Sequence, residues 1–186
     1  RQASLVRLAK NGGKGAAVIS GLYVADNMNF THAIQIDADG QHDLAAVTDF
    51  LDQAHHNPQA LVCGYPIYDQ TVPLSRLWGR ELTNFWVHVN TRSKALRDAM
   101  CGFRVYPLAQ TLPVLPSVKT RRMDFDPDIV VRLIWAGVTV INRPVHVTYP
   151  KDGISHFRGF SDNMRISRLH AGHFCTMLLR RMGLAK

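Results

Sequence analysis

The chain has 186 residues, of which 46% are hydrophobic, which suits one α/β domain with a substantial core and argues against a disordered protein. The formal net charge of +8 predicts an anionic partner, which is a nucleotide, a lipid phosphate, a membrane surface or a nucleic acid. Three widely spaced cysteines without a CxxC pair argue against a zinc site and a disulfide framework, and no apolar run is long enough to cross a membrane.

A glycine-rich loop with a lysine follows the first predicted element. Residues 5–9 are expected to form a short strand, residues 10–15 a loop, and residues 15–27 a helix. Lys14 beside a helix N-terminus suits an anion, and the glycines allow the backbone to approach a ligand. The loop is not a Walker A motif, because Gly15 follows Lys14. The alternative is a glycine-rich turn with a solvated lysine.

The second predicted strand, residues 31–37, runs directly into acidic side chains. Asp37 and Asp39 follow its apolar residues, and Gln41 adds another oxygen ligand. Carboxylates at such a strand end can turn toward one point, as Mg²⁺ or Mn²⁺ requires, with water and substrate phosphate completing the coordination. The alternative is a polar turn, since Asp and Gly are common turn residues.

The next elements continue an alternation of strands and helices. A helix is expected over residues 43–57 and a strand over residues 60–65, so the order to this point is βαβαβ. This order predicts an α/β fold with a mainly parallel sheet and helices on both faces. A helix over residues 74–89 carries an apolar stripe that includes Trp78 and Trp86. We interpret the stripe as core packing, with contact to a membrane or a lipid chain as the alternative.

Two later segments carry charged residues that have either a binding role or a purely structural one. Arg104 alternates with apolar residues in a strand-like run, so it either holds a phosphate or lies on the surface of an edge strand. Asp126 is expected to cap the next helix, and Asp128 favours the positive end of that helix. This capping role explains both acids without any chemistry. Two strand segments then follow, one on each side of Pro144.

The last predicted element is a basic amphipathic helix over residues 160–182, which follows a polar loop over residues 149–158. Such a helix either lies at a membrane interface or packs on the domain with a solvated basic face, and the pattern does not choose between these. We therefore divide the chain into a domain over residues 1–158 and a helix over residues 159–186.

Five short segments stand in a specific order along the chain. They are Asn11-Gly12-Gly13-Lys14-Gly15-Ala16-Ala17, Asp37-Ala38-Asp39-Gly40-Gln41-His42, Cys101-Gly102-Phe103-Arg104, Phe125-Asp126-Pro127-Asp128-Ile129 and Gly153-Ile154-Ser155-His156-Phe157-Arg158. Each segment alone is a weak signal. Together they resemble the family 2 glycosyltransferases, most closely the dolichol-phosphate mannose synthase-like branch.

The resemblance implies a GT-A fold and an inverting transfer of a sugar from a nucleotide sugar, a UDP- or GDP-sugar. The metal-binding acids of the family match Asp37 and Asp39, which would hold Mg²⁺ or Mn²⁺ on the donor diphosphate together with Gln41. Family positions that contact the diphosphate or the acceptor phosphate match Lys14, Arg104, Ser155 and Arg158.

The need for a general base depends on the acceptor. A lipid phosphate already carries a nucleophilic oxygen at neutral pH and needs no base. A hydroxyl acceptor needs one, and the candidates are Asp98, Asp126 and Asp128.

Family members begin with nucleoside-binding segments of the Pro-x-Tyr-Asn and Asp-Gly-Ser type, and neither segment is present here. We therefore expect the chain to lack roughly the first 50 residues of the GT-A domain and to be inactive on its own. The expected partners are a nucleotide-sugar donor and a lipid-phosphate or lipid-linked acceptor. The expected location is the cytoplasmic side of the cell membrane, in peripheral contact with it.

Two other functions compete with this expectation. A basic nucleic-acid-binding module would explain the charge, but the sequence has no RNP, KH, helix-turn-helix or zinc-finger pattern, so we expect no nucleic-acid partner. A catalytically silent GT-A scaffold would explain the absence of the nucleoside-binding segments. The intact acids Asp37 and Asp39 argue against that scaffold.

Overall fold

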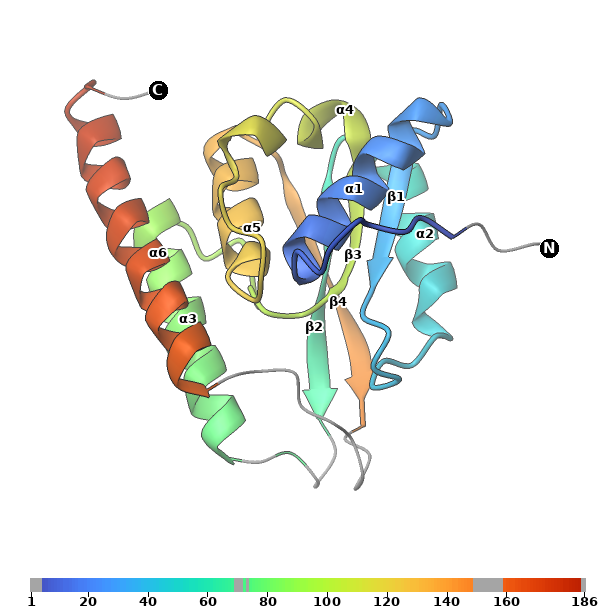
Figure 1. Ribbon diagram of the computed structural model, residues 1–186, viewed down its shortest axis with the longest axis horizontal. Helices are drawn as coiled ribbons and strands as arrows, with labels where there is room; N and C mark the ends of the chain where they lie inside the picture. The colour runs from blue at the N-terminus through green and yellow to red at the C-terminus, as the bar shows by residue number, and fades with distance from the viewer. Residues whose placement is uncertain (1–4, 69–71, 73, 149–158, 185–186) are drawn as a thin grey trace.

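The computed structural model describes residues 5–68, 72, 74–148 and 159–184, which form an α/β structure around one sheet (Figure 1). The helices are α1 (Lys14–Asn27), α2 (Ala46–His56), α3 (Leu74–Thr91), the short α4 (Leu108–Thr111), α5 (Phe125–Trp135) and α6 (Gly159–Arg181). The strands are β1 (His32–Ile36), β2 (Leu61–Tyr68), β3 (Phe103–Pro107) and β4 (Val140–Val147). This arrangement is compatible with the expected GT-A fold.

The sheet is mixed, so the prediction of a mainly parallel sheet is wrong. Among the described strands the order is β1-β3-β2-β4, with β3 antiparallel to both β1 and β2, and β2 parallel to β4. The reason lies in residues 92–102, which run back along α3. In this segment Leu96 bonds to His88 of α3, and Ala99 bonds to Asn84 one turn earlier. The chain therefore returns to the end of the sheet where β2 finished, and β3 enters in the opposite direction.

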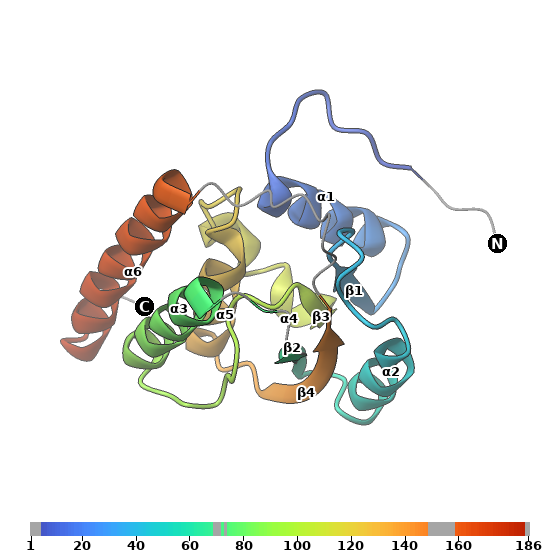
Figure 2. The ribbon, with the colours of Figure 1, turned by 90° about the horizontal axis from the view of Figure 1, so that it is seen from below.

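Helices cover both faces of the sheet (Figure 2). One buried cluster joins α1, α3 and α5 to β2 and β3, and a second joins α2 to β2, β3 and β4. Strand β3 serves both clusters because its side chains alternate between the two faces. Phe103 and Val105 lie in the cluster with α2, whereas Tyr106 lies in the cluster with α5. The helix α6 forms an outer layer against α3 and α5.

Three element boundaries differ from the predictions. Residues 5–9 form no strand. Helix α2 begins at Ala46, because the Asp43 carboxylate accepts a hydrogen bond from the N–H of Ala45 while the Asp43 backbone bonds to a residue of β4. The two segments around Pro144 form one continuous strand, β4, which tolerates a proline because it lies at the edge of the sheet.

The apolar stripe of α3 is largely uncovered on its outer side. Trp78, Leu82 and Phe85 are 76%, 60% and 57% exposed. Trp86, on the neighbouring side of the helix, stacks on His170 of α6. The core-packing interpretation is therefore wrong for the three outer residues, because α6 covers one side of α3 and leaves the other in contact with solvent.

Helix α6 is docked on the domain by polar and aromatic contacts. His173 Nε2 lies 2.9 Å from a carboxylate oxygen of Asp128 in α5, and the guanidinium of Arg180 lies over the ring of Trp135. Of the two alternatives for this helix, packing on the domain is therefore observed, through the helix face that carries His173. No helix in the described part of the chain combines the length and the apolar character needed to cross a bilayer.

Acidification is expected to weaken the docking of α6 through His170, which is 4% exposed. Burial, reinforced by His173, lowers the pKa of His170 from 6.5 to about 4. The neutral form therefore contributes stability that is present above the unfolded-state pKa and is lost as the pH falls from 6.5 toward 4. We expect the free energy of unfolding, measured with urea, to be on the order of 2 kcal/mol lower at pH 5 than at pH 8.

The variants His170→Gln and His55→Gln separate this effect from general acid sensitivity. His55 is exposed on α2, so its replacement should leave the pH dependence unchanged. His170→Gln should remove most of the loss between pH 8 and pH 5, with a remainder from His42, whose pKa is also lowered by burial. Equal pH dependence in the two variants would contradict the assignment.

Candidate functional site

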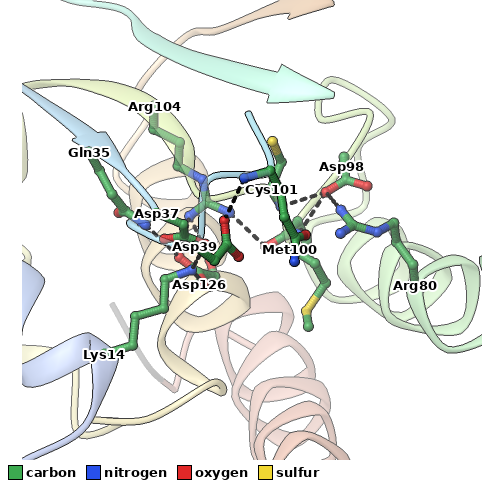
Figure 3. A network of polar contacts seen from close by, with 12 residues as sticks. Lys14, Gln35, Asp37, Asp39, Arg80, Asp98, Met100, Cys101, Arg104 and Asp126 are labelled. Carbon is green, nitrogen blue, oxygen red and sulfur yellow. Dashed lines mark hydrogen bonds and ion pairs between the residues drawn. The ribbon is translucent and has the colours of Figure 1, made fainter. Parts of the chain in front are cut away.

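Three charged side chains from distant parts of the chain meet at one end of the sheet (Figure 3). The Nζ atom of Lys14, at the start of α1, lies 2.7 Å from Asp37 Oδ2 and 2.5 Å from Asp126 Oδ2. Asp37 directly follows β1, and Asp126 lies in the first turn of α5. Burial alone would lower the pKa of Lys14, but the attraction of Asp126 and Asp37 outweighs it and raises the pKa. The lysine is therefore a charged group held between two carboxylates.

The glycine-rich loop allows the start of α1 to press against the start of α5. A Cβ atom at Gly15 would lie 2.5 Å from the Cβ of Phe125. Gly13 has a φ of +91°, and a Cβ there would lie 2.7 Å from the carbonyl oxygen of Arg121. A larger residue at Gly15 would push α1 away from α5, and one at Gly13 would push it away from the segment that leads into α5. The glycines therefore allow Lys14 to reach α5.

Gly102, directly before β3, makes room for the carboxylate of Asp37. A Cβ atom at this position would overlap that carboxylate. The carbonyl of Gly102 also accepts a hydrogen bond of 3.2 Å from the N–H of Asp37. The backbone before β3 therefore fixes the position of Asp37, the acid that follows β1.

Arg104 lies beneath the site and is fully buried. Its guanidinium donates to the backbone carbonyls of Asp126 at 3.0 Å and Ala99 at 2.7 Å, and lies 3.5 Å from the Asp126 carboxylate. Burial disfavours the charged form, but Tyr106 and Asp126 raise the pKa of Arg104. The alternative of a surface arginine on an edge strand is wrong, because β3 is a central strand. With no exposed surface, Arg104 holds Asp126 in place.

Sequence reasoning missed Gln35, a polar residue of this network. Gln35, the next-to-last residue of β1, donates to Asp126 Oδ1 at 3.3 Å and accepts a hydrogen bond of 2.9 Å from the hydroxyl of Tyr106. Gln35 is only 8% exposed, whereas its neighbour Ile34 is 36% exposed. A polar residue at an inward-facing position of an apolar strand is the signal that could have identified it.

Asp39 and Gln41 lie on the open side of the site. Asp39 is exposed, and its Oδ1 accepts a hydrogen bond of 3.1 Å from the N–H of Gln41. Over the described residues, no three His, Cys, Asp or Glu side chains are grouped so that they could hold a metal. The acids fit a hard cation that takes one or two carboxylates and completes its shell with water and phosphate. The ammonium of Lys14 is itself evidence that Asp37 stabilises a positive charge here.

His42 is a second residue that sequence reasoning left out of the site. It lies close enough to the site for the charges of four residues to act on its pKa, namely Asp37, Asp39, Lys14 and Arg80. Burial lowers the pKa of His42 and outweighs the two acids, which act in the opposite direction. Its ring packs edge-on against Phe103 at 5.6 Å between centroids. Asp37 and Asp39 thus both lie near His42, and neither is sealed in the core.

Asp98, considered as a general base, belongs to a separate closed network. It is 3% exposed, and its Oδ1 accepts hydrogen bonds from Arg80 at 2.6 Å and from the N–H groups of Met100 and Cys101. These bonds hold the turn that leads into Gly102. The structure therefore gives Asp98 a role in positioning this turn.

Asp128 and Asp126 are likewise bound by protein groups. Asp128 is fully buried, and its hydrogen bond with His173 and the charge of Arg132 outweigh burial and lower its pKa. Asp126 is 2% exposed and does not cap α5, because the helix begins at Phe125 with Asp124 in the cap position. The prediction of Asp126 as the cap is therefore wrong. Two other predicted site residues, Ser155 and Arg158, lie outside the described residues.

Comparison with known proteins gives one informative similarity. No protein-family model matches the chain. The chain is 26% identical over 133 residues to a protein named dolichyl-phosphate beta-glucosyltransferase from Dictyostelium discoideum. The match covers 67% of this chain and 40% of that protein, so the chain spans well under half of its relative. The similarity supports a general glycosyltransferase role.

Proposed function

We propose that the chain is part of the catalytic domain of an inverting family 2 glycosyltransferase, in or near the dolichol-phosphate mannose synthase-like branch. The donor is a UDP- or GDP-sugar, and the acceptor is a lipid phosphate, with a lipid or glycan hydroxyl as the alternative. The observation that carries the proposal is the placement of Asp37 at an open sheet end, fixed by Lys14 and Gly102. The name of the similar protein supports a lipid-phosphate acceptor.

The proposed reaction is a direct displacement at the anomeric carbon. An oxygen of the acceptor phosphate forms the new bond to that carbon from the face opposite the diphosphate. The bond to the diphosphate oxygen breaks, and the nucleoside diphosphate leaves with the electron pair. A bound Mg²⁺ or Mn²⁺ would neutralise the departing diphosphate.

The residues of the chain have distinct parts in this proposal. Asp37, Asp39 and Gln41 would hold the cation, and Lys14 adds positive potential beside the diphosphate. A phosphate acceptor is already an anion at neutral pH, so no general base is needed. This agrees with the engagement of all three candidate bases, Asp98, Asp126 and Asp128, in bonds to the protein.

The proposal is tested by thermal unfolding of the complete protein with a panel of UDP- and GDP-sugars, each with and without Mn²⁺. We expect one donor to raise the melting temperature in the presence of Mn²⁺ and to have a much smaller effect without it. The absence of stabilisation by every donor would oppose the proposal. Salt-dependent binding of DNA or RNA without any donor effect would favour the nucleic-acid alternative.

The proposal includes peripheral contact with the cytoplasmic face of a membrane. The exposed residues Trp78, Leu82 and Phe85 form an apolar strip on α3, and the neighbouring α6 adds exposed Arg168 and Arg181. Exposed apolar side chains on a protein with exposed arginines suit an anionic lipid surface. The net charge of +8 supports the same partner.

Replacing Leu82 with serine should weaken the binding of anionic vesicles about tenfold, because one exposed leucine no longer enters the lipid. Leu51→Ser is the matched control, since Leu51 is exposed on α2, on the other side of the sheet, and should not matter. Vesicle flotation measures both affinities. Equal binding by the two variants would exclude α3 as the membrane contact.

A further inference from the structure

The formal charges in the buried part of the site sum to zero without a metal ion. The carboxylates of Asp37 and Asp126 carry two negative charges, and Lys14 and Arg104 bring two positive charges into contact with them. The side chains of Asp126 and Arg104 are 3% and 0% exposed, and that of Lys14 is 17% exposed. Charges in such a setting are screened little by solvent, so the balance between them strongly affects which ions can enter.

A divalent cation at Asp37 has to compete with the ammonium of Lys14. Lys14 occupies Oδ2 of Asp37 at 2.7 Å, and this carboxylate is the more enclosed member of the pair formed with Asp39. A divalent cation on Asp37 with Lys14 still in place would bring like charges together in a partly buried site. Either the lysine moves away or further negative charge enters with the cation.

We propose that Lys14 is an internal counter-ion that withholds Asp37 from free divalent cations until a diphosphate enters with the cation. The identity of the diphosphate as a sugar donor rests on the proposed function. The diphosphate supplies the negative charge that offsets the added cation, and Lys14 then moves from Asp37 to a phosphate oxygen. Asp126 keeps its bonds to Arg104 and Gln35, so it does not become an isolated buried charge. The device makes cation binding depend on the donor.

The test is a titration of the protein with Mn²⁺ alone, followed by the electron paramagnetic resonance signal of free Mn²⁺. Lys14→Met should bind Mn²⁺ about tenfold more tightly than the unaltered protein, because a positive charge in contact with Asp37 is removed. Lys10→Met is the matched control, since Lys10 is exposed in the same loop and loses the same charge. It should change the affinity by less than about twofold.

Two further variants keep the test decisive. The double variant Lys14→Met with Asp126→Asn serves if the single variant folds poorly. It removes one positive and one negative charge, so it releases Asp37 and leaves the buried cluster balanced. It should also bind Mn²⁺ more tightly. Adding Asp39→Ala to Lys14→Met should abolish the gain, which locates the ion at the acid pair.

The proposal is overturned if neither Lys14 variant binds Mn²⁺ more tightly than Lys10→Met does. It is also overturned if the gain survives Asp39→Ala. The readout is ion binding and not sugar transfer, so its result is separate from the fate of the proposed function. If the Lys14 variants bind Mn²⁺ more tightly but the protein transfers no sugar, the counter-ion role of Lys14 stands and the proposed transferase function is wrong.

Discussion

Replacing Asp39 with alanine in the complete protein should reduce sugar transfer about a thousandfold or more, while the fold stays intact. Asp39 is exposed and accepts one backbone hydrogen bond from Gln41, so its loss leaves no buried group without a partner. Its proposed part is to hold the cation on the donor diphosphate. The loss should therefore appear in the rate of transfer and not in the free energy of unfolding.

The measurement is the initial rate of product formation with Mn²⁺ and the donor that stabilises the protein most. Asp52→Ala is the control, because Asp52 is an exposed acid on α2 and the substitution removes the same charge. Asp52→Ala should retain normal turnover. Unchanged turnover of Asp39→Ala would remove the metal-binding role that we assign to this residue.

Replacing Arg104 with methionine should destabilise the protein by about 3 to 5 kcal/mol, the largest effect on stability that we expect. The guanidinium is fully buried and satisfies the backbone carbonyls of Asp126 and Ala99. Methionine fills much of the same space but donates no hydrogen bonds, so both carbonyls lose a partner. Lysine should not restore the stability, because one ammonium cannot reproduce the planar fork of donors.

Urea unfolding measures this loss, and Arg143→Met is the matched control. Arg143 also forms a two-point ion pair, with Asp49, but its side chain is 36% exposed, so its replacement should cost about 1 kcal/mol or less. A cost for Arg104→Met as small as that for Arg143→Met would contradict the structural role of Arg104.

Local sequence was sufficient to predict most helices and strands and the position of the acids. The helix α1 after the glycine-rich loop, the strand β1 before Asp37 and the long helix α3 are all present within a few residues of their expected bounds. These features depend on the spacing of apolar residues and on glycine, whose effects act over one or two helical turns. The strand–acid–glycine order could be read in the same way.

The contacts that define the site could not be predicted, because they join residues far apart in the chain. Lys14 meets Asp126, and Arg104 turns inward to hold it, while Asp98 and Asp128 are drawn into other networks. In the sequence, Asp98, Asp126 and Asp128 have the same residue type and the same charge, so nothing local distinguishes them. The partner of each was decided by which buried cation or backbone N–H the packing placed beside it.

The sequence by itself determined that this protein has an α/β core and an acid pair at the end of its first described strand, because periodicity and turn chemistry are local. The tertiary structure decided the reversed direction of β3, the burial of Arg104 and the exposure of Trp78. The physical reason is that the type of a side chain limits which partners it can contact. Which of these partners it does contact depends on the element that packs beside it, as α6 does for Trp86 and α5 for Lys14.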